Sequence, residues 1–224
     1  MKGGIKNNGV IPSCFTSKAI EEKFSKLGVN NEISLILHLP LRYEDETYLC
    51  QISDMPGGEA VQIEGVIVSN EVMYRPRRQL VLQVEDDSGT IFIRFLNFYG
   101  SQIKAYSIGT RVRLLGVPRP GFFGTEMVHP KCHVVNEKAP LPDSLTPVYP
   151  TTAGLSQVII RKLVRKVLID KAKIDNLSET IPVKTLKQYR LNGFMDSIML
   201  LHQPTPDVPA HLLEERIHPA WSRI

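Results

Sequence analysis

The sequence predicts an α+β protein in which a block of β-strands lies between two helical segments. Apolar residues recur at helical spacing before residue 55 and after residue 139, whereas apolar and polar residues alternate in the stretch between them. Prolines cluster between residues 140 and 150 and indicate a linker. We therefore expect an N-terminal helical segment with a connector (1–55), a strand domain (56–138), and a linker followed by helices (139–224).

Composition and charge are those of an ordinary soluble protein. Hydrophobic residues make up 42% and charged residues 22% of the chain, and the net charge of +4 permits a polyanionic partner without identifying one. The three cysteines are widely spaced and odd in number, which argues against a disulfide framework and fits a reducing cytosol. No apolar run approaches the roughly 18 residues that span a bilayer, and the N-terminus has no secretory signal. We expect a monomeric cytoplasmic protein that contacts no membrane.

Two short helices are predicted near the N-terminus. The first covers residues 18–27, and Gly28 follows where a C-cap would lie. The second covers residues 32–39 and ends at Pro40. In the connector after it, Arg42 can pair with the neighbouring acidic residues. We expect this helical pair and its connector to have a packing role.

The central domain has the strand order of a known small barrel. Its first predicted strand begins near residue 60, with Gly65 placed for a bend or bulge. Three strands, a short helix and two further strands are the order of an OB-fold, a five-stranded Greek-key barrel; the alternative is an unrelated five-stranded sandwich. The remaining elements are strands at 80–85 and 90–98, a helical link at 101–106, and strands at 111–117 and 125–135.

The predicted strand at 90–98 carries an unusual cation. Alternation places Ile91, Ile93 and Phe95 on one face and Arg94 on the other, next to bulky apolar side chains. Such a surface suits phosphate neutralisation and base stacking. The alternative is a strand covered by a neighbouring helix, with Arg94 solvated.

The two loops that an OB-fold uses to bind oligonucleotides mix cations with aromatic residues. We therefore expect these loops and the strand at 90–98 to converge on one surface; the alternative is solvated loops whose phenylalanines fill the core. The candidate DNA-binding residues are Arg75, Arg77 and Arg78 in the first loop, Arg94, Leu96, Phe98 and Tyr99 on and after the third strand, and Arg119, Phe122 and Phe123 in the second loop.

The C-terminal segment is predicted to be helical. Residues 155–171 form an amphipathic helix whose polar side carries Arg161, Lys162, Arg165 and Lys166. Such a patch is usually a solvated face, and direct DNA contact is the alternative. Further helices are expected at 183–188 and 193–202, and residues 210–224 read as the start of a helix leading towards another domain.

Motifs for catalysis are absent from the sequence. It has neither a G-x-x-x-x-G-K-[ST] phosphate loop nor a dinucleotide-binding fingerprint, and its acidic residues form no nuclease-like group. His129, Cys132 and His133 lie close together but lack a second pair of ligands, so we expect no metal site. We expect a binding protein with no catalytic residue and no cofactor in this chain.

Several strings together resemble one family. These are HLPLRYED at 38–45, RFLNF at 94–98, EMVHP at 126–130 and LTPVYPTT at 145–152, continued by LHQP at 201–204 and HPA at 218–220. In combination and spacing, from about residue 20 to the end, they resemble RecG, the bacterial ATP-dependent branch-migration helicases.

The resemblance implies an N-terminal wedge region that precedes two motor domains. In that family the wedge grips a stalled replication fork or Holliday junction, splits its arms, and stacks aromatic residues on bases at the branch point. The implied partners are branched DNA and the chain's own motor domains, which would hold ATP and Mg; a single-strand DNA-binding protein is a further candidate. Two other functions remain open: a protein-interaction OB module, and an enzyme in its own right.

Three positions depart from the family pattern. Leu96 stands where the family usually has an aromatic residue. A leucine can still wedge between bases but has no π-face, and Phe98 or Tyr99 could supply the stacking ring instead. The N-terminal helical pair lacks the usual glycines around residues 13–18, and Glu46 occupies a position where the family often has arginine.

Overall fold

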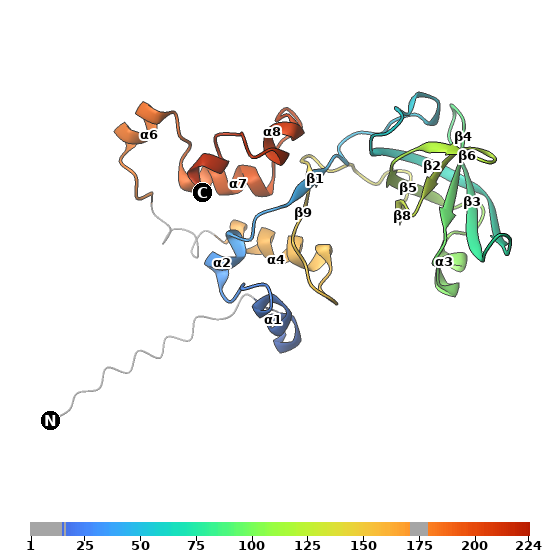
Figure 1. The fold of residues 1–224 in the computed structure, drawn as a ribbon, viewed down its shortest axis with the longest axis horizontal. Coiled ribbons are helices and arrows are strands. Elements are labelled where there is room, and N and C mark those ends of the chain that lie inside the picture. The colour runs from blue at the N-terminus through green and yellow to red at the C-terminus, as the bar shows by residue number, and fades with distance from the viewer. Residues whose placement is uncertain (1–14, 16, 171–178) are drawn as a thin grey trace. The chain divides into compact units, whose positions relative to one another are not determined.

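The computed structural model describes residues 15, 17–170 and 179–224, and it divides the chain into two compact units. The helical unit combines the described residues of Met1–Glu44 with those of Leu145–Ile224, and the strand unit is the continuous stretch Asp45–Ser144 (Figure 1). The α+β class is confirmed. The boundaries suggested by the sequence, after residues 55 and 138, both lie within the strand unit, and the two predicted helical segments contribute to one unit.

The helical unit begins with two capped helices. Ser17 accepts a hydrogen bond from the backbone of Ile20 at the start of α1, and Asn31 and Ser34 form a capping box at α2. Among the described residues no helix has the length and apolar character needed to cross a membrane. The helices of this unit are α1 (Lys18–Ser25), α2 (Glu32–Ile36), α4 (Gln157–Ile169), α6 (Val183–Tyr189), α7 (Phe194–His202) and α8 (Ala210–Glu214), followed by the short η2 (Trp221–Arg223).

Residues from both sides of the strand unit in the sequence contribute to the core of the helical unit. Phe24 of α1 and Leu35 of α2 are fully buried, and they pack in one cluster with Ile160 and Leu163 of α4. The predicted basic patch therefore points away from this core. The predicted helix at the C-terminus is shorter than expected, because α8 stops at Glu214 and Arg216 adopts a left-handed φ of 58°.

A two-stranded sheet, absent from the sequence prediction, completes the helical unit. β1 (Arg42–Glu44) pairs antiparallel with β9 (Thr146–Val148). Arg42 reaches Glu44 on its own strand at 3.4 Å, as the internal pairing in the connector predicted.

The strand unit is a seven-stranded sheet with the order β6-β7-β4-β3-β2-β5-β8. All neighbouring pairs are antiparallel except β4 and β7, which run parallel. The long β2 pairs with β5 along its first half and with β3 along its second half, so the sheet curls around it. The elements are η1 (Ile52–Asp54), β2 (Val61–Met73), β3 (Gln79–Glu85), β4 (Thr90–Phe95), α3 (Gly100–Ala105), β5 (Arg111–Gly116), β6 (Arg119–Gly121), β7 (Gly124–Val128) and β8 (Lys131–Val134).

Gly65 permits a close approach between backbones. A Cβ atom there would lie 2.6 Å from the carbonyl oxygen of Glu85 and 2.7 Å from Cγ1 of Val84. The register irregularity of β2 lies further on, between Ile67 and Ser69, so of the two predicted alternatives at Gly65, a bend or a bulge, the bulge is wrong. Gly65 lets β2 cross tightly over the end of β3.

The predicted strand at 125–135 is two strands. β7 continues the hairpin from β6 and pairs with β4, whereas β8 turns to the opposite end of the sheet and pairs with β5. The break lies at His129, whose φ is 52°, and at Pro130, which has no N–H to donate to a ladder. The predicted strand at 90–98 likewise ends early, at Phe95.

The core of the strand unit is the inner face predicted by alternation. Ile91, Ile93 and Phe95 are buried with the apolar residues of β2, β3 and β5. Arg94 and Phe92 therefore lie on the other face of β4, where the candidate DNA-binding surface was expected.

Candidate nucleic-acid interface

Arg94 lies on the outer face of β4, but most of its side chain is covered. Only 12% of it is exposed, and its Nε donates to Glu126 of β7. Its Nη1 donates to Oε1 of Gln79 on β3 at 3.2 Å. The guanidinium also lies 5.6 Å from the centre of the Phe123 ring. Arg94 is therefore held by protein groups on several sides.

Glu126 joins Arg94 to a second candidate residue. Its other carboxylate oxygen, Oε1, accepts hydrogen bonds from Nε and Nη2 of Arg119 at 3.2 and 3.0 Å. The Glu126 side chain is only 8% exposed, whereas that of Arg119 is 56% exposed. Arg119 therefore keeps a solvent-facing side while its head group is tethered.

The hairpin turn between β6 and β7 presents two aromatic rings. Phe122 is 90% exposed and its ring meets Phe123 edge-on, with the ring centres 5.0 Å apart. Phe123 is partly exposed and lies 5.6 Å from the ring of Phe92 on β4. An exposed ring supported by neighbouring rings gives a base an apolar surface to stack on.

The loop between β2 and β3 supplies exposed cations. Arg75, Arg77 and Arg78 are all exposed. Arg78 lies 4.3 Å above the centre of the Phe98 ring, which is partly buried against the core of the unit. Gln79, at the end of this loop, donates to the carbonyl of Arg75 at 3.5 Å and accepts from Arg94.

The structure thus brings the two loops and Arg94 together, as the sequence predicted. Gln79 links Arg94 to the first loop, and Glu126 and Phe123 link it to the second. Two candidates lie just after β4: Tyr99 is 79% exposed, and Leu96 is half-buried. The backbone N–H of Leu96 donates to Nε2 of His129 at 3.1 Å, which occupies one nitrogen of the histidine that we considered as a metal ligand.

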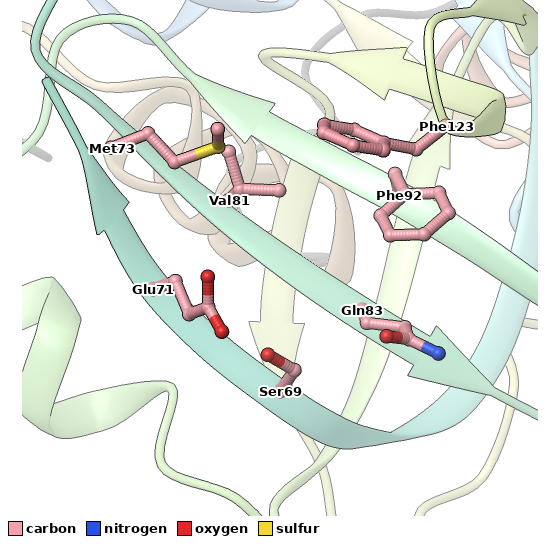
Figure 2. A pocket seen from close by; sticks show the side chains of 7 residues that line it. All are labelled: Ser69, Glu71, Met73, Val81, Gln83, Phe92 and Phe123. Carbon is pink, nitrogen blue, oxygen red and sulfur yellow. The ribbon is translucent and has the colours of Figure 1, made fainter. Parts of the chain in front are cut away.

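A shallow hollow lies beside these residues on the outer face. It holds about 150 Å³ and is lined by Ser69, Glu71, Met73, Val81, Gln83, Phe92 and Phe123. Figure 2 shows the Phe92 and Phe123 rings beside one another, with the side chains of β2 and β3 along the rest of the hollow. Pockets for drug-sized ligands usually hold about 300–1,000 Å³, so this hollow suits a single flat group better than a cofactor. Among the residues that the structure describes, no three His, Cys, Asp or Glu side chains form a group that could hold a metal ion.

Comparison with known proteins identifies the family. Residues 17–170 match the family model described as the RecG wedge domain. The chain belongs to the RecG wedge family.

Two relatives illustrate how much of a RecG protein this chain represents. It is 35% identical to the ATP-dependent DNA helicase RecG of Haemophilus influenzae and 34% identical to that of Escherichia coli (strain K12). In each case the match covers 92% of this chain and 30% of the relative. The chain therefore spans about a third of the length of these RecG proteins.

A solved structure shares the fold of this RecG wedge chain. The structure of RecG bound to a three-way DNA junction matches with a TM-score of 0.66 and 24% sequence identity. The match covers 90% of this chain and 28% of that one. The likeness extends across both units and is a likeness of fold.

The basic patch predicted on α4 of this RecG wedge chain has fewer exposed cations than the sequence suggested. Arg161 of α4 donates to the carbonyl of Pro147 at 3.2 Å and is partly buried. Lys162, Arg165 and Lys166 remain exposed on the helix, and no ion pair of theirs is found within the described ranges. A helix face exposed to solvent is sufficient to explain these three cations.

Sequence reasoning missed two polar residues at the candidate interface of this RecG wedge chain. Glu126 was noticed only within the EMVHP string, and Gln79 was read as the last residue of the first loop without a role of its own. Both are buried polar side chains on strands, and a polar residue at an otherwise apolar position is the signal that could have identified them. Tyr74, which is 71% exposed beside the three arginines, also belongs among the candidates.

Proposed function

We propose that this chain is the DNA-binding wedge of a RecG-type ATP-dependent DNA helicase. It binds branched DNA, such as stalled forks and Holliday junctions, and separates the arms at the branch point during fork regression, repair and recombination. The observation that carries the proposal is the single surface on which exposed arginines, a tethered arginine pair and exposed aromatic rings meet. Family membership supports it, because the matched family is the wedge of a DNA helicase.

In this proposal the strand unit is a partly open OB barrel. The order β7-β4-β3-β2-β5 supports this, because β2 is shared between β3 and β5 and the last of the five strands returns parallel to β4. β6 and β8 are additions at the two ends. In OB-folds, the face of the second and third strands and the loops after the first and fourth strands bind oligonucleotides. These are β3, β4 and the two loops described above.

The partners of the whole protein form part of the same proposal. The parent would act in the cytoplasm as a monomer, with ATP and Mg bound by motor domains that this chain does not contain. Those motor domains and a single-strand DNA-binding protein would be its protein partners. The isolated chain is expected to hydrolyse no ATP when incubated with fork DNA.

A binding titration tests the proposed function. The 224-residue chain is titrated onto a labelled fork and onto a plain duplex with the sequence of one arm, each at two salt concentrations. We expect tighter binding to the fork and a steep loss of affinity with salt, because phosphate contacts release counterions. A chain that binds neither DNA in a salt-sensitive way would overturn the proposal and favour a protein-interaction module.

A further inference from the structure

The carboxylate of Glu126 lies between the two tethered arginines of the proposed DNA surface. One of its oxygens accepts from Arg94 and the other from Arg119. Because the side chain is only 8% exposed, the carboxylate itself is shielded from a bound phosphate. An acidic group at this position weakens the attraction of the surface for DNA. Its role there is therefore to hold neighbouring groups in position.

The same carboxylate fixes the strand that leads into the aromatic turn. Arg119 opens β6, and Phe122 and Phe123 follow at the turn into β7. Gly121 packs directly on the Glu126 side chain, since a Cβ atom at this glycine would lie 2.5 Å from Cδ of Glu126. β6, which leads into the turn, is therefore held to Glu126 of β7 at two points: by the ion pair at Arg119 and by the close packing at Gly121.

Glu126 also fixes the cation beneath the turn. Arg94 is the residue whose guanidinium lies against the ring of Phe123. Glu126 holds its Nε and Gln79 holds its Nη1, so this guanidinium is fixed in one position beside the ring. Glu126 thus acts on both elements that hold the aromatic pair in place.

We infer that Glu126 is a positioning residue that sets the preference for branched over plain duplex DNA by holding the Phe122–Phe123 turn. This inference rests on the proposed function. A rigid aromatic pair can stack on bases that are unpaired at a branch, whereas a plain duplex offers only its phosphates and groove edges. Glu126 therefore affects the ratio of the two affinities more than either affinity alone.

Two substitutions with opposite charge effects test this. Glu126→Gln removes a negative charge and Arg119→Gln removes a positive one, yet each breaks the same tether. We expect the fork-to-duplex affinity ratio to fall by at least about fivefold in both, the size of one lost base–aromatic stack. The matched control is Glu59→Gln, which makes the same charge change at an exposed acidic residue before β2 and should leave the ratio unchanged.

Arg119 is well exposed, so its substitution should leave the chain folded even where Glu126→Gln lowers the melting temperature. The double variant separates positioning from direct contact, because residues that act through one another give non-additive losses. We expect the double variant to have the ratio of the worse single variant.

The outcomes separate the inference from the proposed function. Suppose that the wild-type chain prefers forks, but that Glu126→Gln raises and Arg119→Gln lowers the affinity for fork and duplex alike, with the ratio unchanged within about twofold. The inference is then overturned and the proposed function stands. Additive losses in the double variant would also overturn it, by making Arg119 a direct contact. A wild-type chain without fork preference overturns the proposed function itself.

Discussion

Tyr149 and His202 are joined by a hydrogen bond of 2.8 Å between the tyrosine hydroxyl and Nδ1 of the histidine ring. The other ring nitrogen, Nε2, lies 2.8 Å from the carbonyl oxygen of Ile36, which can only accept. Nε2 therefore carries the proton, and Nδ1 of the neutral ring accepts from Tyr149. One uncharged histidine thus ties together α2, α7 and the segment after β9.

This arrangement predicts acid sensitivity of the helical unit. Burial lowers the pKa of His202 from 6.5 to about 4 in the folded chain. The unfolded chain binds the proton more readily between these values, so stability is complete above about pH 6.5 and is lost as the pH falls towards 4. We expect the free energy of unfolding to fall by about 2 kcal/mol between pH 7 and pH 5 from this group.

Urea unfolding at the two pH values measures the effect. His202→Gln should be less stable at pH 7 but should lack this part of the pH dependence. An equally steep dependence in the variant would assign the acid sensitivity to other groups.

Arg94→Ala is expected to reduce stability as well as fork affinity. The substitution leaves the buried carboxylate of Glu126 with one arginine instead of two, and removing one partner of a buried ion pair costs about 2–4 kcal/mol. Thermal or urea unfolding of the variant checks this. If fork binding is lost while unfolding is unchanged, Arg94 serves the DNA directly and its pairing with Glu126 contributes little.

Arg77→Ala is expected to reduce DNA affinity without reducing stability. Arg77 is exposed and no ion pair of its side chain is found in the described part of the chain, so stability should change by no more than about 0.5 kcal/mol. Affinity should fall for fork and duplex alike, and the slope of log affinity against log salt should decrease by about 1. Lys162→Ala on α4 is the control: an unchanged slope there is expected from a solvated face, and a reduced slope would make α4 a second DNA contact.

Leu96→Phe tests the departure from the family pattern. Leu96 is half-buried at the end of β4, and its backbone N–H rather than its side chain bonds to His129. A ring at this position adds a stacking face, so fork affinity should stay equal or rise. Fluorescence of a base analogue at the branch point reports the stacking. A large loss of affinity together with a lower melting temperature would show that the site is part of the core.

Periodicity was sufficient to predict the elements that depend on local pattern. The inner face of β4, the apolar side of α4 and the short helix α3 follow from alternation and helical spacing. What periodicity cannot show is which partner a strand takes. The division at His129 and Pro130 depends on β7 pairing with β4 and β8 with β5, and the β1–β9 pair joins residues that are far apart in the sequence.

The candidate site was predictable in its location but not in its internal contacts. The types of residue in the two loops and the OB-fold strand order indicated the surface. That Arg94 and Arg119 share one carboxylate could not be read from the sequence, because Glu126 lies seven residues from one and much further from the other. The charge of a residue can be read from the sequence, but whether that charge is free depends on tertiary packing.

The pairing of β1 with β9 makes the strand unit a nested insertion. Glu44 and Thr146 are opposite one another at the points where the chain leaves the helical unit and returns to it. The whole unit with the proposed DNA-binding surface is therefore inserted into what would otherwise be a hairpin. Excising residues 45–144 and joining the flanking strands through a short turn should leave a helical protein that still folds, which circular dichroism would detect. The helical unit would then serve as a host in which one insertion can be exchanged for another.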